Sequence, residues 1–239
     1  MSVATLQTLD AQGIAAAMEH FLDQGVDGVV IIAERQVRED LEAWAAQVPV
    51  VAIAAEQPPG PGYLTTSVDQ VLGARIATRH LLELGHREIV HLAGPQDWLD
   101  GHARVIGWRR ELEQAGIVAG DPIQGDWSAD TGYEVGRRLV HEGVPTAVFA
   151  ANDQLALGLL RAFAEGGVSV PRDVSVVGFD DVMGAAHFIP PLTTVQQGFE
   201  ALGRQCLDML LGAIEGREID HTPIAPRLVV RASTGPPRG

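Results

Sequence analysis

The chain has 239 residues, of which 46% are apolar and 20% charged, enough for a packed core of one or two domains. Its 31 acidic residues outnumber 17 basic ones, all arginine, and give a formal net charge of −14. A chain this acidic repels phosphate backbones, and it also carries no basic stripe. We therefore do not expect it to bind DNA alone.

Other classes of protein are excluded by what the sequence lacks. No apolar run approaches the ~20 residues that cross a bilayer, so no contact with a membrane is expected. The opening residues, MSVATLQTLDAQG, do not form a secretory leader and predict a cytoplasmic chain. The single cysteine, Cys206, excludes an internal disulfide and is interpreted as a small buried residue. No motif indicates a metal or a cofactor.

Helices and strands alternate in the first third of the chain. A helix is expected over 12–24, then a strand over 28–33, a helix over 37–46 and a strand over 48–54. Asp10 and Gly25 are expected to cap the first helix. The QPPGPG run at 57–62 predicts a rigid loop, and a long helix is expected over 69–84.

The same alternation restarts after Gly85. The expected strands and helices, in chain order, are a strand at 88–94, a helix at 103–115, a short segment near Ile123, a helix at 129–141, a strand at 146–151, a helix at 152–165, a strand at 174–180 and a helix at 199–214. The closing residues 234–239 are expected to be disordered.

Repeated β–α–β units predict an α/β protein with parallel sheets covered by helices on both faces. The number of strands favours two lobes joined by crossing strands over one sheet. The predicted lobes are residues 1–86 with 195–221, and 87–194 with 222–233. A doubly wound lobe needs a central first strand, whereas the chain opens on a stub at 2–6. The first lobe is therefore expected to lack its opening strand and helix, as in a fragment, a mis-set start or a truncated gene.

Polar and aromatic residues follow the predicted strands, where open α/β sheets bind ligands. They include Arg104, Trp127, Asn152 and Asp180. Side chains with two donor or acceptor atoms can hydrogen-bond to vicinal hydroxyl groups, and an indole ring can stack on the apolar face of a pyranose. The set predicts a cleft for a sugar or another polyol.

Each of these residues also has a purely structural interpretation. Asn152 suits a helix N-cap, Trp127 a core, Arg104 a solvated first turn and Asp180 a capped turn. An enzyme is not expected. Asp180 and Asp181 are adjacent, and adjacent carboxylates do not flank a glycosidic bond at the ~5–9 Å that glycosidases need. Motifs of hydrolases, P-loops, dinucleotide sites and zinc proteases are absent.

A series of motifs resembles the effector-binding core of LacI-type bacterial repressors. The motifs are LGHREIVHLAGP (84–95), R-x-x-GW (104–108), GDWSADTGY (125–133), AVFAANDQLALGLLRAF (147–163), DVSVVGFDD (173–181) and IPPLTTVQQ (189–197). The resemblance runs from Gln12 to about Ser233 and looks most like the lactose repressor branch. It implies a periplasmic-binding-protein-like fold of two lobes with crossover strands, and a small carbohydrate effector bound between them.

The resemblance also implies a set of ligand-binding positions, namely Arg104, Trp127, Asn152, Asp180, Gln197, Asp100 and Trp98. Arg104 matches the effector-binding arginine, and Asn152 and Asp180 match the pair that binds hydroxyl groups. Trp127 matches the stacking tryptophan and hints at a galactoside. Gln197 would sit near the hinge between the lobes, and the remaining two lie on a wall that varies with the ligand.

Family likeness further implies a homodimeric regulator of transcription. The family's helix-turn-helix headpiece is not in this chain, so operator DNA is an expected partner only of a full-length form. The alternative is a transport-type periplasmic sugar-binding protein with the same lobes, against which the missing leader argues.

Overall fold

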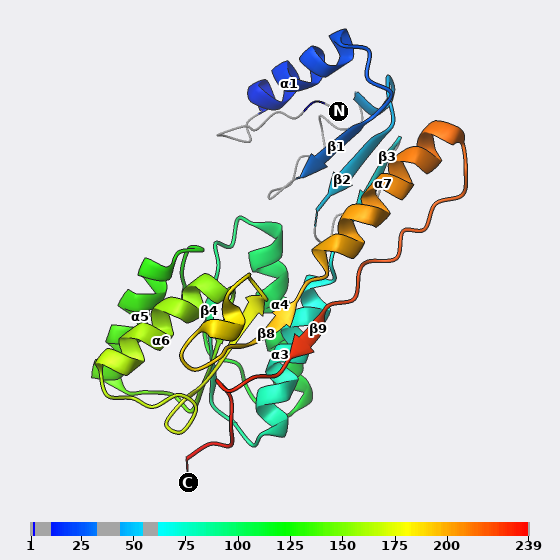
Figure 1. Cartoon of the computed structure of the whole chain (residues 1–239). Coiled ribbons are helices and arrows are strands. Elements are labelled where there is room, and N and C mark those ends of the chain that lie inside the picture. Colours follow the sequence, from blue (N-terminus) through cyan, green and yellow to red (C-terminus); the bar gives the residue numbers. More distant parts are fainter. Residues whose placement is uncertain (1, 3–10, 33–43, 55–61, 239) are drawn as a thin grey trace. The chain divides into compact units, whose positions relative to one another are not determined.

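The computed structural model describes residues 2, 11–32, 44–54 and 62–238 (Figure 1). They belong to two compact units: unit 1 is Met1–Val68 with Phe199–Ile224, and unit 2 is Asp69–Gly198 with Ala225–Gly239. The predictions for Asp10, for most of the stub at 2–6, for most of the helix at 37–46 and for nearly all of the 57–62 loop lie outside the described residues.

Unit 1 contains a parallel sheet in the order β1-β2-β3. Its strands are β1 (Val29–Ile32), β2 (Val50–Ile53) and β3 (Tyr63–Thr66). Helix α7 (Phe199–Glu215) packs Cys206 and Met209 against Val51, so the cysteine is buried as predicted. Helix α1 (Ala11–Asp23) flanks the sheet from the other side (Figure 1). Strand β3 was not predicted, because a run as short as YLTT carries too little periodicity to identify.

Unit 2 contains a sheet in the order β5-β4-β6-β7-β8-β9. Its strands are β4 (Ile89–Ala93), β5 (Ile123–Gln124), β6 (Ala147–Ala150), β7 (Ser175–Asp180), β8 (Thr193–Gln196) and β9 (Arg227–Val229). All neighbours are parallel except β8 and β9. The order reverses at β4, so the carboxyl ends of β4 and β6 form the switch point at which such sheets bind ligands.

Two pairs of helices pack against the unit 2 strands. They are α3 (Gln70–Glu83) with α4 (Leu99–Gln114), and α5 (Ala129–Glu142) with α6 (Asp153–Glu165). The first pair shares a core with Phe149 and Phe179, and the second shares one with Val148 and Val176. Helix α4 begins four residues before its predicted start, because Trp98 at its N-cap makes no side-chain cap and leaves no signal in the sequence.

Helix α3 lies in unit 2, whereas the sequence analysis placed residues 69–86 in the first lobe. Its apolar face, including Ala77 and Leu81, packs in one cluster with Val105 and Phe179. Periodicity shows which face of a helix is apolar, but it does not show which sheet that face covers.

The closing segment also differs from its prediction. Ser233 is buried, and its hydroxyl donates to the carbonyl of Val176 and accepts from the amide of Thr193. Beyond it, the amide of Gly235 donates to the hydroxyl of Ser175. Hydrogen bonds to β7 and β8 thus hold a segment whose polar composition predicts disorder.

Helices α5 and α6 pack closely enough to require glycine. A Cβ atom at Gly158 would collide with the carbonyl oxygen of Ala129 and the amide of Tyr133. We predict that Gly158→Ala lowers the free energy of unfolding by ~2 kcal/mol or more, as overpacked cores do. Urea unfolding followed by circular dichroism measures this change.

Gly203→Ala is the matched control, since Gly203 lies within α7 and a Cβ atom there would meet nothing within 4 Å. It should stabilise the chain by ~0.5–1 kcal/mol, the usual gain in helix propensity. Equal stability of Gly158→Ala and the wild-type chain would contradict the packing.

Candidate ligand-binding site

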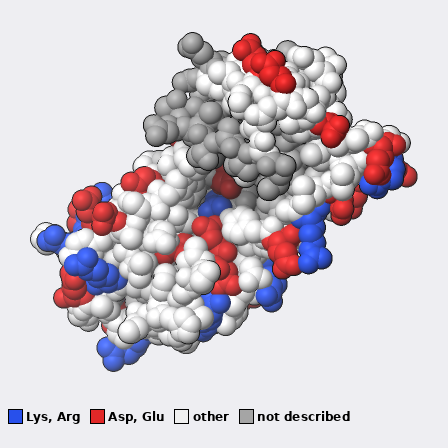
Figure 2. Space-filling view, turned by 45° about the horizontal axis from the view of Figure 1, so that its top comes forward, with Lys and Arg blue, Asp and Glu red and all other residues white. Residues whose placement is uncertain are grey.

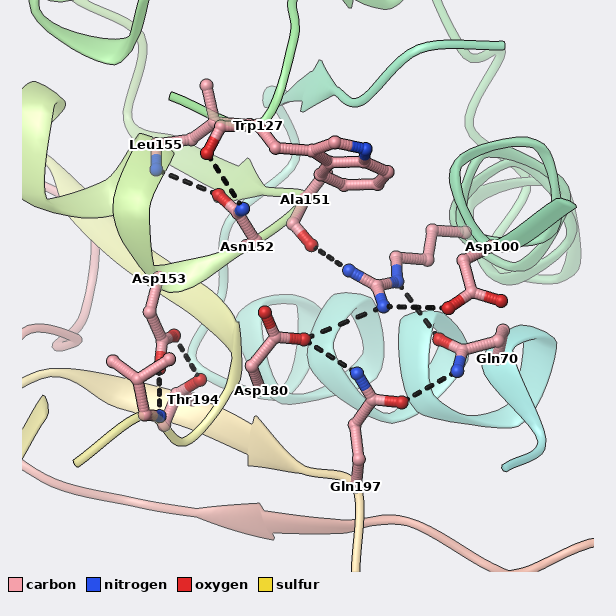
Figure 3. Close-up of polar contacts among 12 residues, drawn as sticks. Gln70, Asp100, Trp127, Ala151, Asn152, Asp153, Leu155, Asp180, Thr194 and Gln197 are labelled. Atoms are coloured by element: carbon pink, nitrogen blue, oxygen red, sulfur yellow. Dashed lines mark hydrogen bonds and ion pairs between the residues drawn. The ribbon is translucent and has the colours of Figure 1, made fainter. Parts of the chain in front are cut away.

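Polar side chains gather in unit 2 at the carboxyl ends of its strands (Figure 3). Arg104 comes from α4 and Asn152 from the N-cap of α6. Asp180 ends β7, and Gln197 directly follows β8. The structure therefore brings together side chains that the sequence analysis predicted to line one cleft.

Arg104 lies at the centre, with its side chain only 3% exposed. Its Nε donates to Oε1 of Gln70 over 3.0 Å, and its Nη1 donates to the carbonyl of Ala151. Its Nη2 lies 3.6 Å from both Oδ1 of Asp180 and Oδ2 of Asp100. These two ion pairs are too long for good hydrogen bonds, so Nη2 keeps N–H donors for a hydroxyl group.

Aromatic rings hold the guanidinium group in place. The Cζ atom of Arg104 lies 3.9 Å from the ring centroid of Phe179 and 5.4 Å from that of Trp127. A planar guanidinium group stacks on aromatic rings, and an ammonium group could not make the same contact. The guanidinium group of Arg104 is thus fixed in orientation before any ligand binds.

Gln197 closes a ring of contacts around Arg104. Its Nε2 donates to Oδ1 of Asp180 over 2.6 Å, and its Oε1 accepts from Nε2 of Gln70 over 2.7 Å (Figure 3). Burial raises the pKa of Asp180, although Arg104 and Gln197 pull it down by favouring the carboxylate.

Trp98 and Trp127 form an aromatic corner beside Arg104. Their ring centroids are 5.6 Å apart and their planes meet at 65°. The indole Nε1 of Trp127 is buried and has no hydrogen-bond partner in the part of the chain that the structure describes. Buried donors in proteins are nearly always paired, so an acceptor from a ligand or a water molecule suits this position.

Both polar atoms of the Asn152 side chain form hydrogen bonds within the protein. Its Oδ1 caps α6 by accepting from the amide of Leu155, and its Nδ2 donates to the carbonyl of Trp127 over 3.0 Å. The structural interpretation of Asn152 as an N-cap is therefore correct. Its contact with a ligand remains a prediction.

Gln70, Phe179 and Asp153 belong to this neighbourhood but were not predicted as site residues. Gln70 lies on the helix that the sequence analysis assigned to the other lobe, and Phe179 lies within a predicted strand and carries no polar group. Asp153 lies in the first turn of α6, where the helix dipole favours an acidic residue. Its place directly after Asn152, at the end of a strand, was the available signal.

Asp153 is fully buried behind the cluster. Its Oδ2 accepts from the amide of Val182 over 2.8 Å, and its Oδ1 accepts from the hydroxyl of Thr194. Burial raises the pKa of the Asp153 carboxyl group from 3.8 to about 6, and the carboxylates of Asp180 and Asp181 add to this effect.

Two kinds of feature are missing from the described residues. Among 11–32, 44–54 and 62–238, no group of three or more His, Cys, Asp or Glu side chains is placed to hold a metal ion. Within the same ranges, no helix has the length and apolarity to cross a membrane.

Comparison with known proteins defines the class of this fold and site. Residues 78–234 match the periplasmic binding protein-like domain family. The structure is similar to a Lac repressor dimer bound to operator and the anti-inducer ONPF, with a TM-score of 0.87, 33% identity, and coverage of 98% of this chain and 82% of that one. It is also similar to the CelR–cellobiose complex, with a TM-score of 0.80, 33% identity, and coverage of 94% and 71%.

Curated relatives identify the family within this class of proteins. The chain is 34% identical over 236 residues to the lactose operon repressor of Escherichia coli, and 30% identical over 235 residues to the transcriptional repressor PurR of Haemophilus influenzae. The alignments cover 97% and 94% of this chain, and 65% and 69% of the two relatives. The chain belongs to the LacI family of transcriptional repressors and corresponds to the effector-binding domain. The predicted family and α/β fold are confirmed.

The raised pKa of Asp153 makes stability depend on pH. Between about pH 4 and pH 6 the Asp153 carboxyl group binds more protons in the folded chain than in the unfolded chain, so its contribution to the free energy of unfolding falls as pH rises. At ~1.4 kcal/mol per pH unit, the Asp153 contribution falls by up to about 3 kcal/mol. Urea unfolding at several pH values should show this fall in the wild-type chain and a smaller one in Asp153→Asn. Identical pH profiles would contradict the assignment.

Proposed function

We propose that the cluster around Arg104 binds a small, uncharged carbohydrate, and that the chain is the sugar-sensing domain of a transcription repressor. The observation that carries this proposal is the buried guanidinium group of Arg104, which is fixed by hydrogen bonds and stacking while Nη2 keeps donors for a ligand. A guanidinium group of fixed orientation beside carboxylate acceptors can hydrogen-bond to a pair of vicinal hydroxyl groups.

The charge of the cluster supports an uncharged ligand. Among the described residues of the cluster, Arg104 is the one cation, whereas Asp100 and Asp180 both lie 3.6 Å from its Nη2. With both carboxyl groups ionised the balance is one negative charge, which disfavours the phosphate group of a sugar phosphate. The corner of Trp98 and Trp127 offers the apolar surface on which a pyranose ring stacks.

Relatives support a carbohydrate, and in particular a galactoside. One solved neighbour is a complex with cellobiose, and a lactose operon repressor is among the curated relatives. The GDWSA motif that contains Trp127 resembles the lactose repressor branch and favours a galactoside over other sugars.

The full-length protein is proposed to act as a cytoplasmic homodimer on operator DNA. The relatives are named as repressors, which favours transcription control over transport or catalysis. On the face drawn in Figure 2, the arginines of the described residues are scattered among acidic side chains and form no basic patch for DNA. As the family likeness implies, the DNA contacts are proposed to lie in the headpiece of the full-length form. Effector binding would favour one conformation and shift operator affinity by a coupling of ~1–3 kcal/mol.

The test is calorimetric titration of the chain with neutral galactosides and glucosides, their 6-phosphates and purine bases. We expect a neutral sugar to bind and its 6-phosphate to bind at least tenfold more weakly. Arg104→Ala should weaken binding ~10–100-fold, since hydrogen bonds to charged groups contribute ~1.5–3 kcal/mol.

Arg109→Ala is the control, because Arg109 lies on the same helix with a half-exposed side chain and a loose 4.0 Å ion pair to Asp121. It should leave affinity unchanged. Failure of every sugar to bind, or tighter binding of a purine or a sugar phosphate, would overturn the proposal.

A further inference from the structure

The backbone at Asp180 and Asp181 adopts a conformation that L residues rarely take. The φ angles are 111° at Asp180 and 55° at Asp181, both in the left-handed region that favours glycine. Such a strained backbone persists only when its surroundings hold it in place. This turn decides where the Asp180 carboxylate points.

Anchors hold the turn from two sides. On one side, the Asp181 carboxylate accepts from Nη2 of Arg231 over 2.6 Å and from Nε2 of Gln196 over 2.7 Å. On the other side, the amide of Val182 donates to Oδ2 of Asp153 over 2.8 Å. Asp180 itself is left to face Arg104 and Gln197.

Asp153 is built into the floor beneath this turn. It is 0% exposed, and a Cβ atom at Gly178 would collide with its Oδ1, so only glycine at 178 leaves room for the carboxyl group. Its Oδ1 is oriented by the hydroxyl of Thr194 on β8. Both carboxyl oxygens are thereby committed to the protein rather than to the cluster around Arg104 (Figure 3).

We propose that Asp153 is a positioning residue of the effector site, whose buried carboxyl group fixes the Asp180–Asp181 turn and thereby aims the Asp180 carboxylate at the ligand. This inference rests on the proposed function, because its effect on affinity requires a ligand at Asp180. The anchoring of the turn can be measured without a ligand.

Asparagine can preserve the anchor. Its carbonyl oxygen accepts from the amide of Val182, and its amide nitrogen donates to the hydroxyl of Thr194, which is able to accept. Alanine removes both acceptors and leaves the amide of Val182 without its partner. Asp153→Asn should therefore rescue what Asp153→Ala loses.

Ser233→Ala offers a matched control. The Ser233 hydroxyl joins Val176 on β7 to Thr193 on β8 through two buried hydrogen bonds, and Thr193 and Val176 lie toward the amino-terminal ends of those strands. Its loss should lower the melting temperature comparably to Asp153→Ala, but away from the turn.

Two measurements on the whole chain test the proposal. Hydrogen exchange of the Val182 amide, followed by NMR, should be at least tenfold faster in Asp153→Ala than in the wild-type, Asp153→Asn and Ser233→Ala chains. In calorimetry with the neutral sugar that binds best, Asp153→Ala should bind at least tenfold more weakly, and the other two variants should stay within about threefold of wild type. If Asp153→Ala does not fold, Thr194→Val should give faster exchange of the Val182 amide than the wild-type and Ser233→Ala chains.

Several outcomes would overturn the positioning role. They are unchanged exchange at Val182 in Asp153→Ala, wild-type affinity in that variant, an equal loss in Ser233→Ala, and a failure of Asp153→Asn to restore binding. If no sugar binds the wild-type chain, the proposed function fails instead, and the exchange of the Val182 amide still decides whether Asp153 anchors the turn.

Discussion

The buried charge of Arg104 is the constraint on which the rest of the site depends. Burying an isolated guanidinium group away from water costs several kcal/mol, so its neighbours must supply hydrogen-bond acceptors and opposite charge. Gln70, the carbonyl of Ala151, Asp100 and Asp180 do so from four separate parts of unit 2. Truncating Arg104 would remove the shared partner of all four.

The parallel sheet of unit 2 makes this convergence possible. Parallel strands deliver their carboxyl ends to one edge, and the reversal of order at β4 opens space there. Close packing of α5 against α6, as at Gly158, holds the helix that Asn152 caps, while α4, which carries Arg104, shares an apolar core with α3. The strained turn at Asp180 then aims a carboxylate at a group that is already fixed.

Much of this arrangement could be predicted, and the failures have physical reasons. The strands and helices of unit 2 follow from long, strongly periodic segments. Arg104, Trp127 and Asp180, which the sequence analysis took from the segments after the strands, do lie near one another, and their contact with a ligand stays a prediction. The strand YLTT was missed because four residues carry too little pattern. Gln70 was missed because its helix was assigned to the wrong sheet, and the order of residues 234–238 comes from hydrogen bonds that composition does not encode.

The sequence by itself determined the alternation of strands and helices and the family, because these follow from local periodicity and from ordered motifs. Only the tertiary structure decided that α3 covers the sheet of unit 2 and that Gln197 links Asp180 to Gln70. It also showed that Asp153 supports the Asp180–Asp181 turn. Such contacts join residues far apart in the chain, and their geometry depends on packing rather than on the identity of any one residue.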